Sequence, residues 1–228
     1  MQEMELVGIN EKEEKEGIMS KIKRKLYFGI KRMIDIIFSF FGILILLPVA
    51  LITKICYLLS KDTKSIFYKQ KRIGKDGKFI YIYKLRSMVY NADEVLEELL
   101  KDKKYKKEWE ENQKLTNDPR ITKIGKILRK TSLDELPQFI NVMYGDMSLI
   151  GPRPLVEGEL DAHNGIHELY ECVRPGISGW WAANGRSCTD YKERLELEYY
   201  YCKNCSLILD IKCILLTIKA VISRTGAK

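Results

Sequence analysis

Histidine is nearly absent from this chain, which contains only His163 and His167 among its 228 residues. With so few imidazoles, the sequence disfavours a catalytic triad that depends on histidine. It also contains neither a G-x-x-x-x-G-K-[ST] nor a G-x-G-x-x-G motif, so it gives no support to a P-loop ATPase or a Rossmann enzyme. Internal repeats and low-complexity tracts are missing as well. These absences direct attention to carboxylates and arginines.

Cysteine pairs are also scarce. The six cysteines are scattered, at positions 56, 172, 188, 202, 205 and 213. Only Cys202 and Cys205 have the C-x-x-C spacing of a redox or metal site, and no second pair stands near them. We therefore expect free thiols on an amphipathic helix. The long apolar run begins too deep for a cleavable secretory signal, so we expect most of the chain to face a reducing cytosol.

Positive charge, by contrast, is in excess. Lysine and arginine number 39 against 31 acidic residues, which gives a net charge of +8. Such a balance favours anionic partners: nucleic acid, anionic lipid or phosphorylated substrates. The length suits one domain, or one domain with an appendage. We divide the chain into a polar and basic leader (1–27), a membrane helix (28–60) and a cytoplasmic catalytic domain with interfacial helices (61–228).

Residues 36–53 form the one long uncharged segment. At 18 residues it is at the lower limit for a spanning helix, which needs about 20. Pro48 lies inside it and favours a kink. A helix–break–helix that enters and leaves by the same face fits these features, and a kinked spanning helix is the alternative. Cations flank both ends: Lys21, Lys23, Arg24, Lys25, Lys31 and Arg32 before it, and Lys54, Lys61 and Lys64 after it.

The remaining segments predict a mainly helical α+β fold. Residues 67–88 indicate a small β-hairpin around Gly74-Lys-Asp-Gly77, and residues 91–113 a charged, solvated helix. Residues 121–130 carry isoleucine and leucine at helical spacing among cations, which is typical of an interfacial helix or of a core-facing stripe. Residues 206–223 contain three charges, which makes a second spanning helix costly and favours an amphipathic helix.

Asp134 and Glu135 are adjacent acids with two interpretations. Ser132-Leu-Asp-Glu135 matches the S-x-x-E capping box, and acids in a first helical turn complement the helix dipole. This interpretation explains both carboxylates without any function. The other interpretation is catalysis, and the neighbouring loops favour it.

Three glycine-containing loops hold arginines downstream of the acidic pair. They are Gly151-Pro-Arg-Pro154, Arg174-Pro-Gly-Ile-Ser-Gly179 and Asn184-Gly-Arg-Ser187. Arginine suits bidentate binding of phosphate, and glycine lets backbone N–H groups approach phosphate oxygens. An ordinary tight turn with a surface arginine explains any one loop, but three beside an acidic pair favour phosphate binding. Mg²⁺ fits too, because it binds through one or two carboxylates together with substrate phosphates.

Several short motifs follow one another along the chain: Lys31-Arg-Met-Ile-Asp35, Lys84-Leu-Arg-Ser-Met88, Asp118-Pro-Arg120, Ser132-Leu-Asp-Glu-Leu-Pro-Gln138, Gly145-Asp-Met-Ser-Leu-Ile-Gly-Pro-Arg-Pro154 and Arg174-Pro-Gly-Ile-Ser-Gly-Trp180. In this order, and with the apolar run that contains Pro48, they resemble the bacterial sugar transferases, the monotopic polyprenyl-phosphate phosphoglycosyl transferases. The resemblance runs from about residue 28 to the C-terminus and is closest to the small form of the family. Leu47-Pro48 departs from the Ser-Pro of some members, and Cys202 and Cys205 replace residues that are more often apolar or aromatic.

The resemblance implies transfer of a sugar 1-phosphate from a UDP-sugar to undecaprenyl phosphate, with release of UMP. Asp134 would be the nucleophile and form a covalent phosphosugar intermediate. Glu135, with Asp134, would place Mg²⁺. Candidate residues for binding the substrate phosphates are Arg129, Arg153 and Arg174, with Arg186 a weaker candidate.

The same resemblance places the protein at the bacterial inner membrane, with its catalytic domain on the cytoplasmic face. Its expected partners are the UDP-sugar donor, the undecaprenyl phosphate acceptor, membrane lipid and downstream glycosyl transferases, with no nucleic acid. Two alternatives stay open: a basic, membrane-anchored scaffold or nucleic-acid binder, and an ordinary glycosyl transferase that releases UDP. The sequence identifies neither the sugar nor the glycan pathway.

Overall fold

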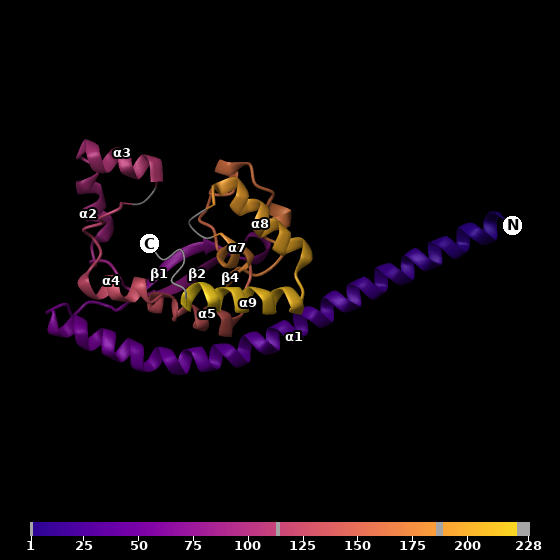
Figure 1. Ribbon diagram of the computed structural model, residues 1–228, viewed down its shortest axis with the longest axis horizontal. Coiled ribbons are helices and arrows are strands. Elements are labelled where there is room, and N and C mark those ends of the chain that lie inside the picture. Colours follow the sequence, from indigo (N-terminus) through magenta and orange to yellow (C-terminus); the bar gives the residue numbers. More distant parts are fainter. Residues whose placement is uncertain (1, 113–114, 186–188, 223–228) are drawn as a thin grey trace.

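The computed structural model describes residues 2–112, 115–185 and 189–222 (Figure 1). Over these residues the chain is mostly helical, with two small sheets, which confirms the predicted mainly helical α+β class. The helices are α1 (Gln2–Leu59), α2 (Ala92–Leu99), α3 (Lys103–Asn112), α4 (Lys123–Lys130), α5 (Gln138–Tyr144), α6 (His167–Tyr170), α7 (Trp180–Asn184), α8 (Tyr191–Asn204) and α9 (Leu207–Ile222). The strands are β1 (Phe67–Ile73), β2 (Phe79–Leu85), β3 (Ser148–Ile150) and β4 (Gly176–Ser178), and the 3-10 turns are η1 (Lys75–Gly77), η2 (Leu133–Glu135) and η3 (Asp161–His163).

The first helix, α1, is one continuous element of 58 residues that runs through Pro48. Figure 1 shows it as a gently curved rod, with the rest of the chain on its concave side. The predicted break at Pro48 is therefore not seen. Proline removes one helix hydrogen bond, and a long helix absorbs that loss by bending. A re-entrant path through lipid stays a prediction, as does the boundary between leader and membrane helix, because both segments lie within α1.

The part of α1 from Lys21 to Leu59 is long and apolar enough, by length and composition, to cross a membrane. Its inner face packs on the protein: Leu46 and Tyr57 are buried, and a Cβ on Gly42 would lie 2.4 Å from the ring of Phe139 in α5. Its outer face is not covered by any described residue. The large apolar side chains exposed there include Ile36, Ile37, Phe40, Phe41, Leu44, Ile45, Leu47, Leu51, Ile52 and Ile55.

Polar contacts fix α1 to the domain at both ends of its apolar run. Near the start, Lys31 Nζ lies 2.7 Å from Asp210 Oδ2 in α9, and Asp35 accepts a hydrogen bond from a backbone N–H of β3. Near the end, the hydroxyl of Tyr57 donates to the backbone oxygen of Arg86 at 2.7 Å. The stretch from Lys31 to Tyr57 covers about 39 Å at 1.5 Å per residue. The domain therefore lies along nearly the whole apolar run.

The strands β1 and β2 pair along their whole length as an antiparallel hairpin, which confirms the hairpin predicted over residues 67–88. At its tip, Asp76 adopts the left-handed conformation, with a φ of 57°. On its inner face, Ile80 and Ile82 are buried against Val142 and Met147. Val142 belongs to α5, so this cluster attaches the hairpin to the helix that follows the acidic pair. The strands β3 and β4 form a separate, parallel pair.

The other predicted helices are present with changed limits. The stretch 91–113 divides into α2 and α3, which project away from the body of the molecule (Figure 1). In α4, Leu128 is buried while Ile127 is 64% exposed, so this helix has both a core-facing and a solvent-facing apolar residue. The amphipathic character predicted for 206–223 is confirmed over α9, where Leu209 and Cys213 are buried and Leu215 is exposed.

Candidate active site

Asp134 and Glu135 lie in η2, the short turn between α4 and α5. The turn is held by apolar side chains on either side of the acids: Leu133 and Leu136 pack against the cluster that contains Leu46 of α1. The two carboxylates are thereby placed beside the long apolar helix. A site in this position can act on a ligand that is anchored in a membrane.

The capping box predicted for Ser132 and Glu135 is not formed. Ser132 has a φ of 56° and makes no side-chain hydrogen bond to cap a helix, and α5 begins later, at Gln138, after Pro137. An N-cap residue usually has extended backbone angles, and the left-handed conformation of Ser132 departs from them. The capping interpretation of the acidic pair therefore loses its basis.

Two cations stand close to the acids. Lys84 Nζ, at the end of β2, lies 3.3 Å from Glu135 Oε1. Burial, followed by the negative charge of Glu135, raises the pKa of Asp134, while Lys84 and Arg129 act to lower it. The site thus places two adjacent carboxylates against two cations in partly buried surroundings. Such a pair offers oxygen ligands to a hard cation such as Mg²⁺, with substrate phosphates completing its shell.

Arg129 is positioned by a serine from the end of the hairpin. Its Nε donates to Ser87 Oγ at 2.8 Å. The helix α4 approaches this segment closely, because a Cβ on Gly125 would lie 1.8 Å from the backbone oxygen of Ser87. The side chain of Thr122 caps α4 by accepting a hydrogen bond from the N–H of Gly125. Only glycine permits this approach, and the approach is what brings Arg129 to Ser87.

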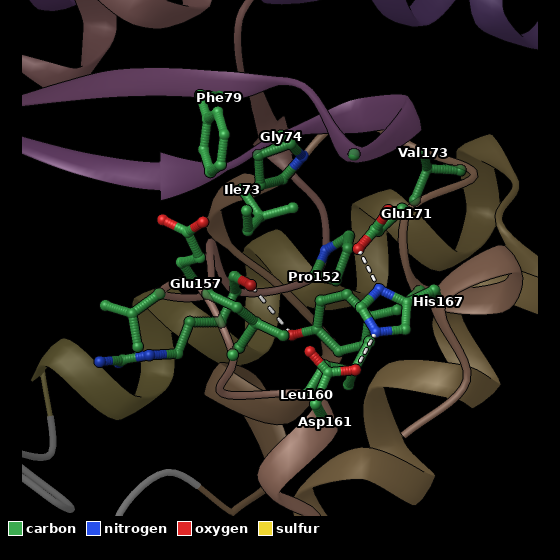
Figure 2. Close-up of a pocket in the computed structure, with 17 residues that line it drawn as sticks. Ile73, Gly74, Phe79, Pro152, Glu157, Leu160, Asp161, His167, Glu171 and Val173 are labelled. Atoms are coloured by element: carbon green, nitrogen blue, oxygen red, sulfur yellow. Dashed lines mark hydrogen bonds and ion pairs between the residues drawn. The ribbon is translucent and has the colours of Figure 1, made fainter. Parts of the chain in front are cut away.

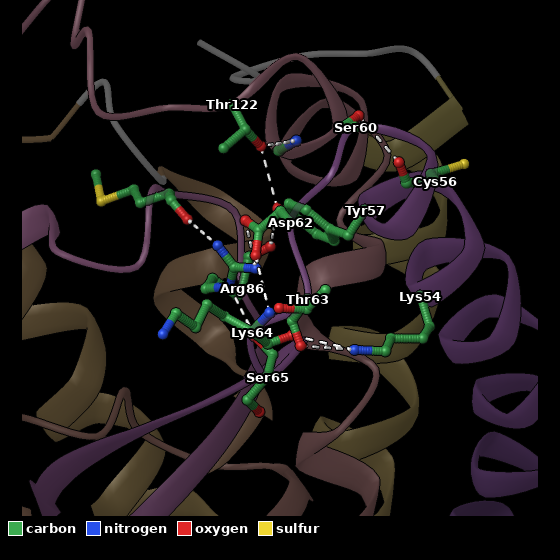
Figure 3. Close-up of polar contacts among 12 residues, drawn as sticks. Lys54, Cys56, Tyr57, Ser60, Asp62, Thr63, Lys64, Ser65, Arg86 and Thr122 are labelled. Carbon is green, nitrogen blue, oxygen red and sulfur yellow. Dashed lines mark hydrogen bonds and ion pairs between the residues drawn. The ribbon is translucent and has the colours of Figure 1, made fainter.

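Arg86 ties the same segment to the end of α1, as Figure 3 shows. Its guanidinium lies 4.3 Å from the centre of the Tyr57 ring and donates to Asp62 Oδ2 at 2.9 Å and to the backbone oxygen of Ser65 at 2.7 Å. Arg86 is buried and its side chain is committed to these partners. It therefore serves as a structural anchor between Lys84 and Ser87, the two residues that touch the site.

The other predicted arginines have contacts elsewhere. Arg174 Nε donates to the backbone oxygen of Gly145, at the opposite end of α5 from the acids. Arg153 lies over the ring of Trp181, 5.6 Å from its centre, and its backbone N–H donates to Glu198 Oε1. Arg186 lies outside the described residues. Of the four arginines predicted to bind phosphate, the structure brings Arg129 together with the acids.

Lys84 and Ser87 were not among the predicted site residues. Both residues belong to Lys84-Leu-Arg-Ser-Met88, a motif that carries the family resemblance but does not by itself indicate a contact with the acids. Along a strand, successive side chains alternate between faces, so Lys84 points away from the buried Leu85. The sequence shows this alternation along β2. Which face of the strand meets the acids depends on how α5 packs against β2.

A separate cavity of about 260 Å³ lies between the hairpin tip and the loop that follows Pro152 (Figure 2). His167 stands at its edge, with its ring nitrogens 2.8 Å from Asp161 Oδ1 and 2.7 Å from Glu171 Oε1. The hydrogen bonds that the His167 ring makes to the carboxylates of Asp161 and then Glu171 raise the pKa of His167. Arg153 lines this cavity, and neither Asp134 nor Glu135 does.

An apolar helix with an uncovered face, fused to a basic domain that holds two acids among cations, has the features of a membrane-associated protein with a site for phosphorylated ligands. The sequence of residues 26–224 matches the family described as bacterial sugar transferase. The chain belongs to this family, as its motifs predicted.

Three relatives of this chain carry names that state an activity or a role. The chain is 44% identical over 199 residues to the UDP-galactose-lipid carrier transferase of Erwinia amylovora, which covers 87% of this chain and 41% of the relative. It is 44% identical over 211 residues to the undecaprenyl-phosphate galactose phosphotransferase of Salmonella typhimurium, and this match covers 92% of this chain and 44% of the relative. It is 39% identical over 198 residues to the exopolysaccharide production protein ExoY of Sinorhizobium fredii, and this match covers 86% of this chain and 87% of the relative. The chain thus spans less than half of the first two relatives and most of the third.

Proposed function

We propose that this protein transfers a sugar 1-phosphate from a UDP-sugar to undecaprenyl phosphate and releases UMP. The observation that carries the proposal is the pair Asp134–Glu135, held against Lys84 and Arg129 beside an apolar helix, in a chain of the bacterial sugar transferase family. The names of two relatives support the reaction class: one is a UDP-galactose-lipid carrier transferase and another an undecaprenyl-phosphate galactose phosphotransferase.

The proposed chemistry has two displacements at phosphorus. A carboxylate oxygen of Asp134 attacks the sugar-proximal phosphorus of the donor, and the bond to the bridging oxygen breaks as UMP leaves with the electron pair. A phosphate oxygen of undecaprenyl phosphate then attacks the phosphorus of the phosphosugar–Asp134 adduct. That step releases the Asp134 carboxylate and forms the lipid-linked diphosphosugar. Each displacement exchanges one P–O bond for another, so no oxidant or reductant is needed.

The residues around Asp134 would act by electrostatics. Negative charge gathers on the diphosphate as the bridging bond breaks, and a fixed cation stabilises that charge without having to reorganise. Arg129 is held by Ser87 for this role, and Lys84 offsets the charge of Glu135. The oxygens of Asp134 and Glu135 would hold Mg²⁺, which supplies further stabilisation to the phosphate oxygens when bound.

The packing of α1 supports a position at one face of the inner membrane. A spanning helix leaves the bilayer at two faces, but α1 is bonded to one domain through both Lys31 and Tyr57. Burying that domain beside a spanning helix would take its charged residues into lipid, which is costly. A helix whose outer apolar face enters lipid while its inner face stays on the protein avoids this cost. We therefore include in the proposal a cytoplasmic position at one face of the membrane, with α1 lying in the interface as a continuous helix instead of turning back at Pro48.

Nucleotide release tests the reaction. Membranes that contain the wild-type chain should release UMP from one of a panel of UDP-sugars in the presence of Mg²⁺, whereas an ordinary glycosyl transferase would release UDP. The variant Asp134→Asn should stay folded and membrane-bound but lose turnover, and donor alone should leave an added sugar phosphate on the wild-type protein in intact-protein mass spectrometry. Near-normal UMP release by Asp134→Asn would exclude the nucleophile, and absence of any nucleotide release would favour a scaffold.

A further inference from the structure

A second cavity, of about 220 Å³, lies between residues 25–35 of α1 and a surface formed by the hairpin tip, β3 and the loop before β4. Its lining is unusually rich in positive charge and includes the phenol rings of Tyr27 and Tyr201. Five cations line it: Lys25, Lys31, Arg32, Lys75 and Arg174. Nothing in the proposed reaction makes use of this group.

Structural needs account for part of this charge. Lys31 pairs with Asp210 at 2.7 Å, and Arg32 donates to the backbone oxygens of Val142 and Met143 at the end of α5. Both cations therefore hold the fold together. A cation at a helix C-terminus is expected, because that end carries about half a negative charge.

The positive charge of the five cations exceeds the negative charge described around the cavity. Asp35 is the acid among the described lining residues, and the ion pairs of the five cations are Lys31 with Asp210 and Lys75 with Asp76, the latter at 3.9 Å. After these three and the helix end are set against the five cations, an excess of about one to two positive charges remains. Lys25, Lys75 and Arg174 line the cavity and are exposed to solvent, so a ligand in the cavity can contact them. The excess matches the charge of one phosphate group.

The cavity is separate from the candidate active site. Asp134 and Glu135 precede the first residue of α5, whereas Arg32 and Arg174 gather at its last turn, on Val142, Met143 and Gly145. The seven residues of α5 alone put about 10 Å between the two places. The cavity also lies where the basic segment of α1 meets its apolar run, which is the depth at which a lipid headgroup would sit.

We propose that this cavity is a second phosphate-binding site, distinct from the site of Asp134, which takes a phosphate group carried by a lipid headgroup or free in solution. Arg174 and the two exposed lysines contact the phosphate oxygens, while Lys31 and Arg32 supply positive charge from behind. Binding there would join α1 to the hairpin tip and to the loop before β4. It would thereby stabilise the attachment of the membrane helix to the domain.

Thermal unfolding of the full chain in a neutral detergent tests this, at constant ionic strength set with chloride. The probes are inorganic phosphate, short-chain dihexanoyl phosphatidic acid and, as a zwitterionic control, dihexanoyl phosphatidylcholine. We expect a saturable rise in Tm that the double variant Lys25→Gln/Lys75→Gln weakens by about tenfold or more in apparent affinity. The variant Lys103→Gln/Lys106→Gln, which removes two cations from α3, should respond like the wild type.

The outcomes separate this site from the proposed reaction. Asp134→Asn should keep the full response, since its carboxylate lies at the other end of α5. A response to inorganic phosphate identifies a free phosphate as sufficient, and a response to phosphatidic acid alone identifies a lipid headgroup. The inference is wrong if neither probe gives a saturable shift, if both double variants respond alike, or if Asp134→Asn abolishes the response. Circular dichroism confirms that each variant is folded.

Discussion

Lys84 Nζ lies 3.3 Å from Glu135 Oε1, and this contact joins the end of the hairpin to the turn that carries the acidic pair. The two residues are 51 positions apart in the sequence. Their meeting depends on the side chain of Asn141, fully buried in α5, which accepts a hydrogen bond from the N–H of Tyr83 and donates to the backbone oxygen of Tyr81. One buried amide thus fixes the strand that presents Lys84 against the helix that follows Glu135.

Replacing Lys84 by methionine should reduce turnover while leaving the protein folded. The change removes a positive charge beside both carboxylates, and loss of one preorganised electrostatic contact lowers kcat by about 100-fold or more. UMP release by purified variants measures the effect. Lys69→Met is the matched control, because Lys69 is on the same hairpin and lies over the Tyr83 ring, 5.6 Å from its centre. Equal activity of the two variants would contradict a role for Lys84 in turnover.

Gly125→Ala should lower both stability and activity. A Cβ there would lie 1.8 Å from the backbone oxygen of Ser87, so α4 has to move away and take Arg129 with it. Overpacking of this kind costs about 1–3 kcal/mol of unfolding free energy. Gly29→Ala in α1 is the control, since its new Cβ meets nothing within 4 Å. Thermal unfolding and UMP release report the two effects, and a neutral Gly125→Ala would contradict the close approach of α4.

The contribution of His167 to stability should depend on pH. Its folded pKa is raised above 6.5 by Asp161 and Glu171, so its stabilising contribution is fully present below pH 6.5 and is lost as pH rises through the raised value. His167→Gln should therefore have a lower Tm than the wild type at pH 6, and the difference should shrink by pH 9. Asp161→Asn should move this loss to lower pH. A difference that is constant with pH would show that the ion pairs contribute nothing.

Both ends of the apolar run of α1 should lie on the cytoplasmic face. Lys31 and Tyr57 bind one domain, and cations flank both ends of the run. Single cysteines at Ser20 and Ser65, in a background without the native cysteines, can be probed with an impermeant thiol reagent. We expect both to be protected in intact cells and labelled once the cells are opened. Labelling of position 20 alone in intact cells would establish a spanning helix.

Local physics made several features readable from the sequence alone. The turn residues at Gly74-Lys-Asp-Gly77 and the flanking β-formers specified the hairpin, and the spacing of apolar residues specified α4 and α9. The uncharged run 36–53 specified an apolar helix, and the ordered motifs specified the family. Each of these depends on residues that are neighbours in the chain.

Tertiary structure alone decided the composition of the site. It passed α1 through Pro48 without a break, left Ser132 without a capping side-chain hydrogen bond, and joined Lys84 to Glu135. It also placed Arg174 at the opposite end of α5 from the acids, although the sequence presented the arginine loops as one set. The reason is that these outcomes depend on packing between segments far apart in the chain. A charge pattern names the groups that bind phosphate, but only the packed helices and strands determine which of them share a site.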